Sequence, residues 1–324
     1  MLPCPAAIFS PSPQEARDAK KDWYSGQPVG AFVDIGNAST ETDDEPIFST
    51  TAAKVCMFYQ RPDPRLQPWV SHYWLSSGGA PQHVLLPDGC VDVVVARTAR
   101  EATVWLYGTA TQRTVIDVEP TVRYLGVRFL PGQARHFLRM SAAELTDRAE
   151  AVKGDDALGL AEAHWLADGA GGVFAELDRL LLRLLARHPP RRLALDNLLL
   201  YLHRPQHPSL VTLAASCGLS RRQMERLCRT HVGVSPACFA MIRRCHRALA
   251  LLAPPATPQA LMSLSLASIA AEAGYADQSH MTRELRRFTG QTPGMLRRSG
   301  PGADVAFVLS GADLSHHTAS LSDL

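Results

Sequence analysis

Cysteine is scarce in this 324-residue sequence, and the cysteines that occur are not spaced as zinc ligands or as a disulfide framework. No C-x-x-C pair is present, and the seven cysteines are Cys4, Cys56, Cys90, Cys217, Cys228, Cys238 and Cys245. An odd and scattered set argues against a disulfide scaffold and against a zinc finger. It favours a reducing compartment, so we expect a cytoplasmic protein without a metal site.

Long apolar runs and the common motifs of nucleotide-binding and hydrolytic enzymes are also missing. The longest apolar runs reach about half of the roughly 20 residues that span a bilayer. The first residues lack the basic and apolar regions of a secretory signal. No G-x-x-x-x-G-K-S/T, G-x-G-x-x-G or G-x-S-x-G stretch occurs. We therefore expect neither membrane insertion nor enzymatic activity, and hence no catalytic residue and no cofactor.

Lysine is absent from residues 205–300, although this segment is strongly basic. It contains 12 Arg and 4 acidic residues, a net charge of +8, whereas residues 1–204 contain 21 basic and 24 acidic residues, a net charge of −3. A basic block joined to a mildly acidic one indicates a polyanionic partner for the C-terminal third. An Arg-rich solvated surface without a partner would give the same charge.

Turn signals and hydrophobic periodicity divide the chain into five parts. These are a disordered extension (1–56), a β-rich module (57–165), a linker helix (166–192), a basic helical domain (193–299) and a disordered tail (300–324). Six short β-rich runs predict strands at Val70–Leu75, Val84–Leu86, Val91–Val95, Thr103–Tyr107, Thr114–Val118 and Tyr124–Phe129. We predict an α+β protein in which a small barrel-like or sandwich-like module precedes an all-α domain.

One amphipathic helix is predicted between the two domains, at Val173–Arg187. Its leucines recur at helical spacing in a single stripe, at Leu177, Leu180, Leu181, Leu184 and Leu185. The stripe either packs on its own domain, which we favour, or forms the seam of a homodimer.

Two segments of the basic region resemble each other, with their glycines Gly218 and Gly274 lying 56 residues apart. Each has an Ala-Ala helix, a glycine, a short turn and then an Arg-rich helix. Glycine can adopt the positive φ that ends a helix sharply, and Ser220 and Asp277 are good N-caps for the helices that follow. This layout predicts two helix-turn-helix motifs, whose second helices fit a major groove.

A predicted helix at Pro236–Leu252 connects the two motifs. Its roughly 17 residues give a rod of about 26 Å, comparable with the roughly 34 Å between successive turns of one groove. Arg243, Arg244 and Arg247 lie opposite its apolar stripe, where we expect them to contact phosphates.

Residues 193–298 resemble the DNA-binding domain of AraC/XylS-type transcriptional regulators. The resemblance rests on Ala214-Ala215, Gly218-Leu-Ser220, Gly233-Val-Ser-Pro236, Ile269-Ala270, Gly274-Tyr275 and Arg287-Phe288-Thr-Gly290-Gln-Thr-Pro293. It implies a domain of seven helices, with base contacts from Arg222, Glu225, Arg226, Gln278, Ser279 and Arg283. We expect further phosphate contacts from Arg221, Arg229, Arg286 and Arg287.

Two features depart from the pattern of that family. Cys228 replaces a usual aromatic core residue, which puts the packing of the first motif in doubt. The linker Pro254–Ser265 is unusually long, so we expect it to bulge away from DNA.

The N-terminal region resembles a less characterised module found before this domain in some family members, which implies that residues 57–165 are a sensor or dimerisation module and residues 193–299 a DNA-binding domain. The likeness rests on Pro68-Trp-Val-Ser-His-Tyr-Trp74, Leu86-Pro-Asp-Gly-Cys90-Val-Asp92 and Gly126-Val-Arg-Phe-Leu-Pro-Gly132. Trp74, Cys90 and Arg128 are candidate effector-binding residues, although aromatic residues in such a module more often form core. His72, His83 and Cys90 lack the dense spacing of a metal site.

The sequence thus predicts a bacterial transcriptional regulator, with activation the expected mode, that binds double-stranded DNA. RNA polymerase, a small-molecule effector and a second copy of the chain are further candidate partners. The alternative is an N-terminal enzyme or metal-dependent sensor with an accessory DNA-binding domain.

Overall fold

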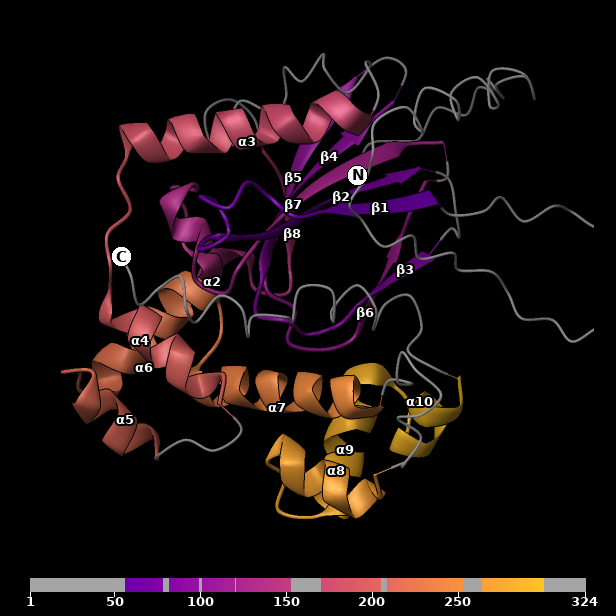
Figure 1. Ribbon diagram of the computed structural model, residues 1–324, viewed down its shortest axis with the longest axis vertical. Coiled ribbons are helices and arrows are strands. Elements are labelled where there is room, and N and C mark those ends of the chain that lie inside the picture. Colours follow the sequence, from indigo (N-terminus) through magenta and orange to yellow (C-terminus); the bar gives the residue numbers. More distant parts are fainter. Residues whose placement is uncertain are drawn as a thin grey trace, which may run out of the picture.

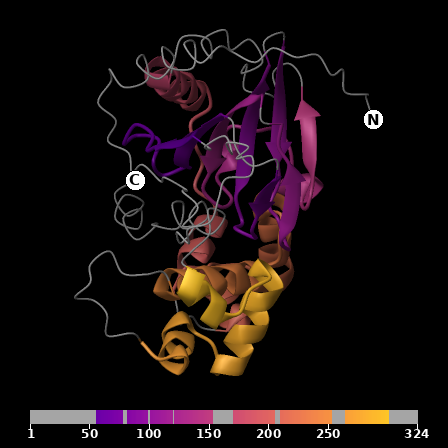
Figure 2. The same cartoon turned by 90° about the vertical axis from the view of Figure 1, so that its right-hand side faces the viewer.

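The computed structural model describes residues 56–77, 82–98, 101–119, 121–152, 170–204, 209–252 and 264–299. The predicted extension up to residue 55, most of the linker Pro254–Ser265 and the predicted tail lie outside these ranges. A β-rich module stands above a layer of helices (Figures 1 and 2). The predicted α+β architecture is confirmed. No helix in the described part of the chain is long and apolar enough to cross a membrane.

The N-terminal module is built on an antiparallel sheet of six strands. Their order is β1 (Cys56–Gln60), β2 (Val70–Ser77), β7 (Arg123–Phe129), β4 (Val91–Arg97), β5 (Ala102–Tyr107) and β8 (Ala149–Val152). A separate ribbon pairs β3 (Gln82–Leu85) with β6 (Thr114–Asp117). A short 3-10 turn η1 (Ala134–His136) and helix α2 (Ala142–Leu145) follow β7. All six predicted strands are present, whereas β1 and β8 were not predicted.

Helix α3 (Ala170–Arg187) covers one face of this sheet (Figure 1). Leu177 and Leu181 are fully buried in the same core as Val93, Leu106 and Val127. The Tyr73 hydroxyl donates to Asp178 Oδ1 at 2.8 Å, which fixes the helix to β2. The leucine stripe therefore packs on its own domain and is not available as a dimer seam.

Seven helices form the C-terminal domain among the described residues, as predicted. They are α4 (Ala194–Leu202), α5 (Leu210–Ser216), α6 (Arg221–Val232), α7 (Pro236–Leu252), α8 (Leu266–Ala273), α9 (Gln278–Thr289) and α10 (Pro293–Ser299). Ser220 caps α6 in a capping box with Gln223, and the Asp277 carboxylate accepts from the His280 N–H at the start of α9. Gly233 and Gly290 end these two helices with φ values of 91° and 76°.

Helix α7 contributes to two separate cores, one in each motif. Phe239 packs with α4, α5 and α6, whereas Ile242 and Leu249 pack with α8, α9 and α10. Cys228 is fully buried in the first core, so the departure from an aromatic residue leaves this position closed to solvent. One continuous helix thus connects the two motifs.

Candidate DNA interface

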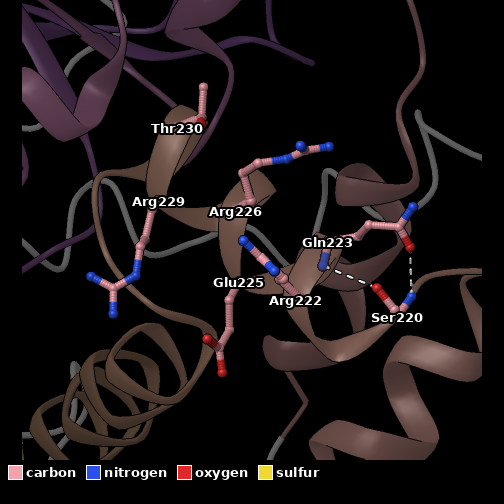
Figure 3. Close-up of a pocket in the computed structure, with 7 residues that line it drawn as sticks. All are labelled: Ser220, Arg222, Gln223, Glu225, Arg226, Arg229 and Thr230. Carbon is pink, nitrogen blue, oxygen red and sulfur yellow. Dashed lines mark hydrogen bonds between the residues drawn. The ribbon is translucent and has the colours of Figure 1, made fainter.

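The outward face of α6 is basic and open to solvent. Arg222, Arg226 and Arg229 are exposed, and Glu225 is half-buried. An open hollow of about 610 Å³ borders this face (Figure 3), lined by Ser220, Arg222, Gln223, Glu225, Arg226, Arg229 and Thr230. The three arginine side chains project from different turns of the helix (Figure 3). A surface of this shape and charge suits the edge of an anionic duplex.

Helix α9 presents the corresponding face in the second motif. Gln278, Ser279 and Arg283 are all exposed along one side, and Arg286 and Arg287 continue it toward the C-terminal end. Both guanidinium and carboxamide groups can form paired hydrogen bonds to base edges. The six residues implied as base contacts are therefore divided between α6 and α9, and five of them are exposed.

A polar cluster between α7 and α9 helps to set the position of α9. Arg244 on α7 forms an ion pair with Glu284 at 2.5 Å, and its guanidinium lies 4.8 Å from the centre of the Tyr275 ring. His280 Nε2 lies 3.2 Å from the same carboxylate. Arg247 donates to the carbonyl oxygens of Ala273 and His203. Both arginines thus hold helices together through contacts within the protein.

The prediction that Arg243 contacts phosphate is wrong in this arrangement. Its side chain is only 7% exposed, because the N-terminal module packs against the side of α7 that carries it. Desolvation by burial lowers the pKa of Arg243 to about 10. A duplex cannot reach this guanidinium while the two domains stay in contact.

Arg128, one of the three candidate effector-binding residues, belongs to a buried ion cluster. It binds both carboxylate oxygens of Asp92 at 2.9 and 2.7 Å and reaches Asp88 at 2.9 Å. Burial raises the pKa of Asp88 to about 6, an effect that the neighbouring Arg128 opposes. Two carboxylates of the same module therefore balance the Arg128 charge, so an acidic effector is not needed to neutralise it.

Of the other two candidate effector-binding residues, Cys90 lies next to this cluster. The Cys90 backbone N–H donates to Asp88 at 2.9 Å, and burial raises the pKa of the Cys90 thiol. Trp74 lies directly over Gly126, where a Cβ atom would come within 1.9 Å of the indole. Only a glycine at position 126 leaves room for this ring. Among the described residues, no group of three or more His, Cys, Asp or Glu side chains is placed so that it could hold a metal ion.

Sequence reasoning missed two contributors to the α6 face. Gln223 closes the capping box at Ser220, a role that the S-x-x-Q spacing signals. Thr230 borders the hollow near the end of the helix, and nothing in the local pattern distinguishes it.

Comparisons with known proteins fit this geometry. Residues 213–299 match a family described as "Helix-turn-helix domain", and residues 59–151 match one described as "Domain of unknown function (DUF6597)". Among curated proteins, none matches the chain.

Several solved structures are similar to parts of this chain. A transcriptional regulator with an AraC-type DNA-binding domain from Chromobacterium violaceum is 24% identical, covering 33% of this chain and 90% of its own, with a TM-score of 0.29. A probable AraC family regulator from Rhodopseudomonas palustris CGA009 is 27% identical over 33% of this chain and 98% of its own, with a TM-score of 0.28. ToxT from Vibrio cholerae is 8% identical over 71% of this chain and 98% of its own, with a TM-score of 0.38.

Proposed function

We propose that this chain, whose residues 213–299 form an AraC-type helix-turn-helix domain, is a transcriptional regulator that reads two adjacent major-groove segments with α6 and α9. The observation that carries the proposal is the pair of exposed, polar helix faces joined by the single helix α7. Each face combines long polar side chains with a helix end capped by glycine. The N-terminal ends of both helices are free to enter a groove.

Sequence discrimination would come from side chains that reach base edges. Arg222, Arg226 and Arg283 have the donor geometry for the O6 and N7 atoms of guanine, and Gln278 has that for adenine. Glu225 can accept from cytosine N4, although it also accepts from Arg221 Nε at 3.1 Å. Ser279 can bond to more than one base, so it adds affinity with less selectivity.

Affinity would come largely from arginine contacts to the phosphates. Arg221, Arg229, Arg286 and Arg287 are exposed beside the two reading faces. Each phosphate that they neutralise releases condensed counterions, so binding should weaken steeply as salt rises. Arg244 and Arg247 are less suited to this role, because their N–H groups bind acceptors within the protein.

Selection from a random library of DNA duplexes, using the full chain, tests this function. We expect one enriched motif, and binding to it that is at least about 1,000-fold tighter than binding to scrambled duplexes. The matched control is Arg148→Ala, which removes an exposed arginine of the N-terminal module and should leave the enriched motif unchanged. Equal binding to enriched and scrambled duplexes would contradict the proposal.

Control by a small molecule, contact with RNA polymerase, assembly of two copies and a cytoplasmic location stay predictions from the sequence. The free cysteines of the described residues suit a reducing compartment. The alternative of an N-terminal enzyme is less favoured, because Asp88, Asp92 and Arg128 bind one another in a buried cluster.

A further inference from the structure

We propose that the N-terminal module is a scaffold that binds the helix-turn-helix domain of its own chain and holds α6 and α9 in a fixed relative position. This inference rests on the proposed function. The turns at Pro87–Gly89 and Pro131–Gly132, which lie in two of the stretches that carry the N-terminal resemblance, belong to the docking surface. They therefore have a binding role that the local pattern did not predict.

The first set of contacts is at the C-terminal end of α6. The Thr109 hydroxyl lies 2.5 Å from the carbonyl oxygen of Val232, and the Thr146 hydroxyl lies 2.8 Å from that of Gly233. Ser141 donates to the carbonyl oxygen of Thr230 at 3.2 Å. The last carbonyl groups of a helix have no partner within it. Three hydroxyl groups of the N-terminal module supply those partners for the first recognition helix.

The N-terminal module approaches the backbone of Gly233 so closely that a side chain would not fit at this position. A Cβ atom there would lie 2.9 Å from Thr146 Oγ1 and 3.1 Å from the carbonyl oxygen of Ala142. Gly233 therefore has two functions, since it ends α6 with a positive φ and also admits the N-terminal module.

A second contact joins the Pro87–Gly89 turn to α7. The carbonyl oxygen of Pro87 accepts from His246 Nε2 at 2.7 Å, and both groups are buried. A Cβ atom at Gly89 would lie 2.7 Å from the Phe239 ring, within the core of the first motif. The turn is thus pressed against the helix that joins the two motifs.

A third contact secures α4. Asp196 is 6% exposed, and it accepts from Arg135 at 2.7 Å and from Gln133 at 3.0 Å. Its other oxygen accepts from the Leu193 backbone N–H at 2.8 Å. Although burial opposes ionisation, Arg135 holds the pKa of Asp196 below its usual value. The start of α4 is therefore fixed to residues that follow the Pro131–Gly132 turn.

The second motif is contacted by the β3–β6 ribbon and its flanking residues. Leu86, next to β3, is 5% exposed and lies in the same core as Tyr275 and Leu285. A Cβ atom on Gly290, at the end of α9, would lie 3.6 Å from Arg113 Cδ. The N-terminal module therefore contacts the C-terminal ends of both recognition helices.

None of these contacts covers the proposed reading faces. Arg222, Arg226, Gln278 and Arg283 stay exposed while the module is bound to the ends of their helices. The two layers meet along α7 and the C-terminal ends of the recognition helices (Figures 1 and 2). While the N-terminal module is bound, both helices can therefore contact DNA at the same time. Binding then costs less conformational entropy than it would if the two helices moved independently.

The test compares the full chain with a Thr109→Val/Thr146→Val variant, which removes two hydroxyl groups at nearly constant volume. The matched control is Thr98→Val/Thr121→Val, whose hydroxyl groups bond within exposed segments of the N-terminal module. Ser141→Ala replaces the double variant if that variant does not fold, as judged by circular dichroism.

The first readout is hydrogen–deuterium exchange without DNA. We expect faster exchange at residues 229–239 in the double variant, and wild-type exchange in the control. Unchanged exchange at these residues in the double variant would overturn the scaffold proposal, regardless of the affinity of the chain for DNA.

The second readout is affinity for an enriched duplex with both segments intact and for one with the second segment scrambled. The double variant should lose about tenfold on the intact duplex and less than about threefold on the scrambled one, because one-segment binding does not need a fixed second helix. Equal losses on the two duplexes, or no loss on either, would overturn it. A wild-type chain that enriches no sequence would instead reject the proposed function, and the exchange measurement would still decide the docking.

Discussion

The Nε2 atom of His246 on α7 lies 2.7 Å from the carbonyl oxygen of Pro87 in the N-terminal module. Because a carbonyl oxygen only accepts, Nε2 must carry the hydrogen. Nδ1 faces the Arg243 guanidinium at 3.4 Å, where an acceptor is needed. His246 is therefore neutral in the folded protein, and its contact with the N-terminal module uses the tautomer that carries hydrogen on Nε2.

This histidine should make the stability of the protein fall at mildly acidic pH. Desolvation by burial, followed by the Arg243 charge, lowers the pKa of His246 to about 3. The unfolded chain takes up a proton near pH 6.5, whereas the folded chain does not until about pH 3. Stability is therefore complete above pH 6.5 and is lost as pH falls through this window. At pH 5 the loss from one such histidine is about 2 kcal/mol.

His246→Gln tests this dependence, because a glutamine side chain can still donate to Pro87 but cannot titrate. We expect urea unfolding free energies measured between pH 7 and pH 5 to fall less in His246→Gln than in the wild type. His72, whose pKa burial also lowers to about 3, keeps its own share of the dependence in both proteins. Identical pH profiles would show that His246 is not the buried neutral group described above.

Breaking the Arg244–Glu284 pair should destabilise the domain more than breaking an exposed pair of the same kind. Arg244→Ala leaves a largely buried carboxylate without its cation and should cost about 1–3 kcal/mol in urea unfolding. Arg221→Ala removes an i,i+4 pair whose side chains are 71% and 42% exposed, and it should cost less than about 0.5 kcal/mol. Equal costs would contradict the positioning role of Arg244.

Substitution of Gly89 and of Gly218 separates the cost of backbone strain from the cost of disturbing the contact between the two domains. Both have positive φ, 79° and 68°, so Gly→Ala at either should cost about 1 kcal/mol through backbone strain. A Cβ atom at Gly218 meets nothing within 4 Å, whereas one at Gly89 collides with Phe239. We expect Gly89→Ala to cost a further 1–3 kcal/mol or so in thermal or urea unfolding. A smaller cost at Gly89 than at Gly218 would argue against the packed turn.

Salt dependence should separate the phosphate contacts from the internal arginines. Arg229→Ala and Arg286→Ala should each reduce the slope of log affinity against log salt by about 1, on enriched and scrambled duplexes alike. Arg243→Gln, at the buried position, should leave the slope unchanged. A slope that changes with Arg243 but not with Arg229 would require DNA to lie on the opposite side of α7.

Much of the helical domain could be predicted from the sequence, because its determinants are local. Ser220 and Asp277 start helices and Gly233 and Gly290 end them, through hydrogen bonds within a few residues. The orientation of Arg243 could not be predicted in this way. Arg243 lies opposite the apolar stripe of α7, a position that predicts exposure to solvent. In the structure this side of α7 is also buried, because it packs against the Pro87–Gly89 turn, which lies more than 150 residues earlier in the chain.

The docking surface could not be predicted from the sequence, for the same reason. Pro87-Asp88-Gly89 and Pro131-Gly132 carry clear turn signals, and each signal accounts for the local chain reversal by itself. The residues that these turns contact depend on packing between distant parts of the chain, which the spacing of residues in the sequence does not indicate. The short edge strands β1 and β8 also lacked a pattern strong enough to predict them.

The most direct test of the account repeats the duplex selection with Arg226→Ala and with Arg283→Ala in the full chain. If α6 and α9 read separate segments, the wild type should enrich two clusters of bases about one helical turn apart. Each variant should then relax the preference in one cluster only, a different one for each, at about 1–3 kcal/mol per position. Enrichment of a single cluster, or the same change in both variants, would contradict reading by two helices.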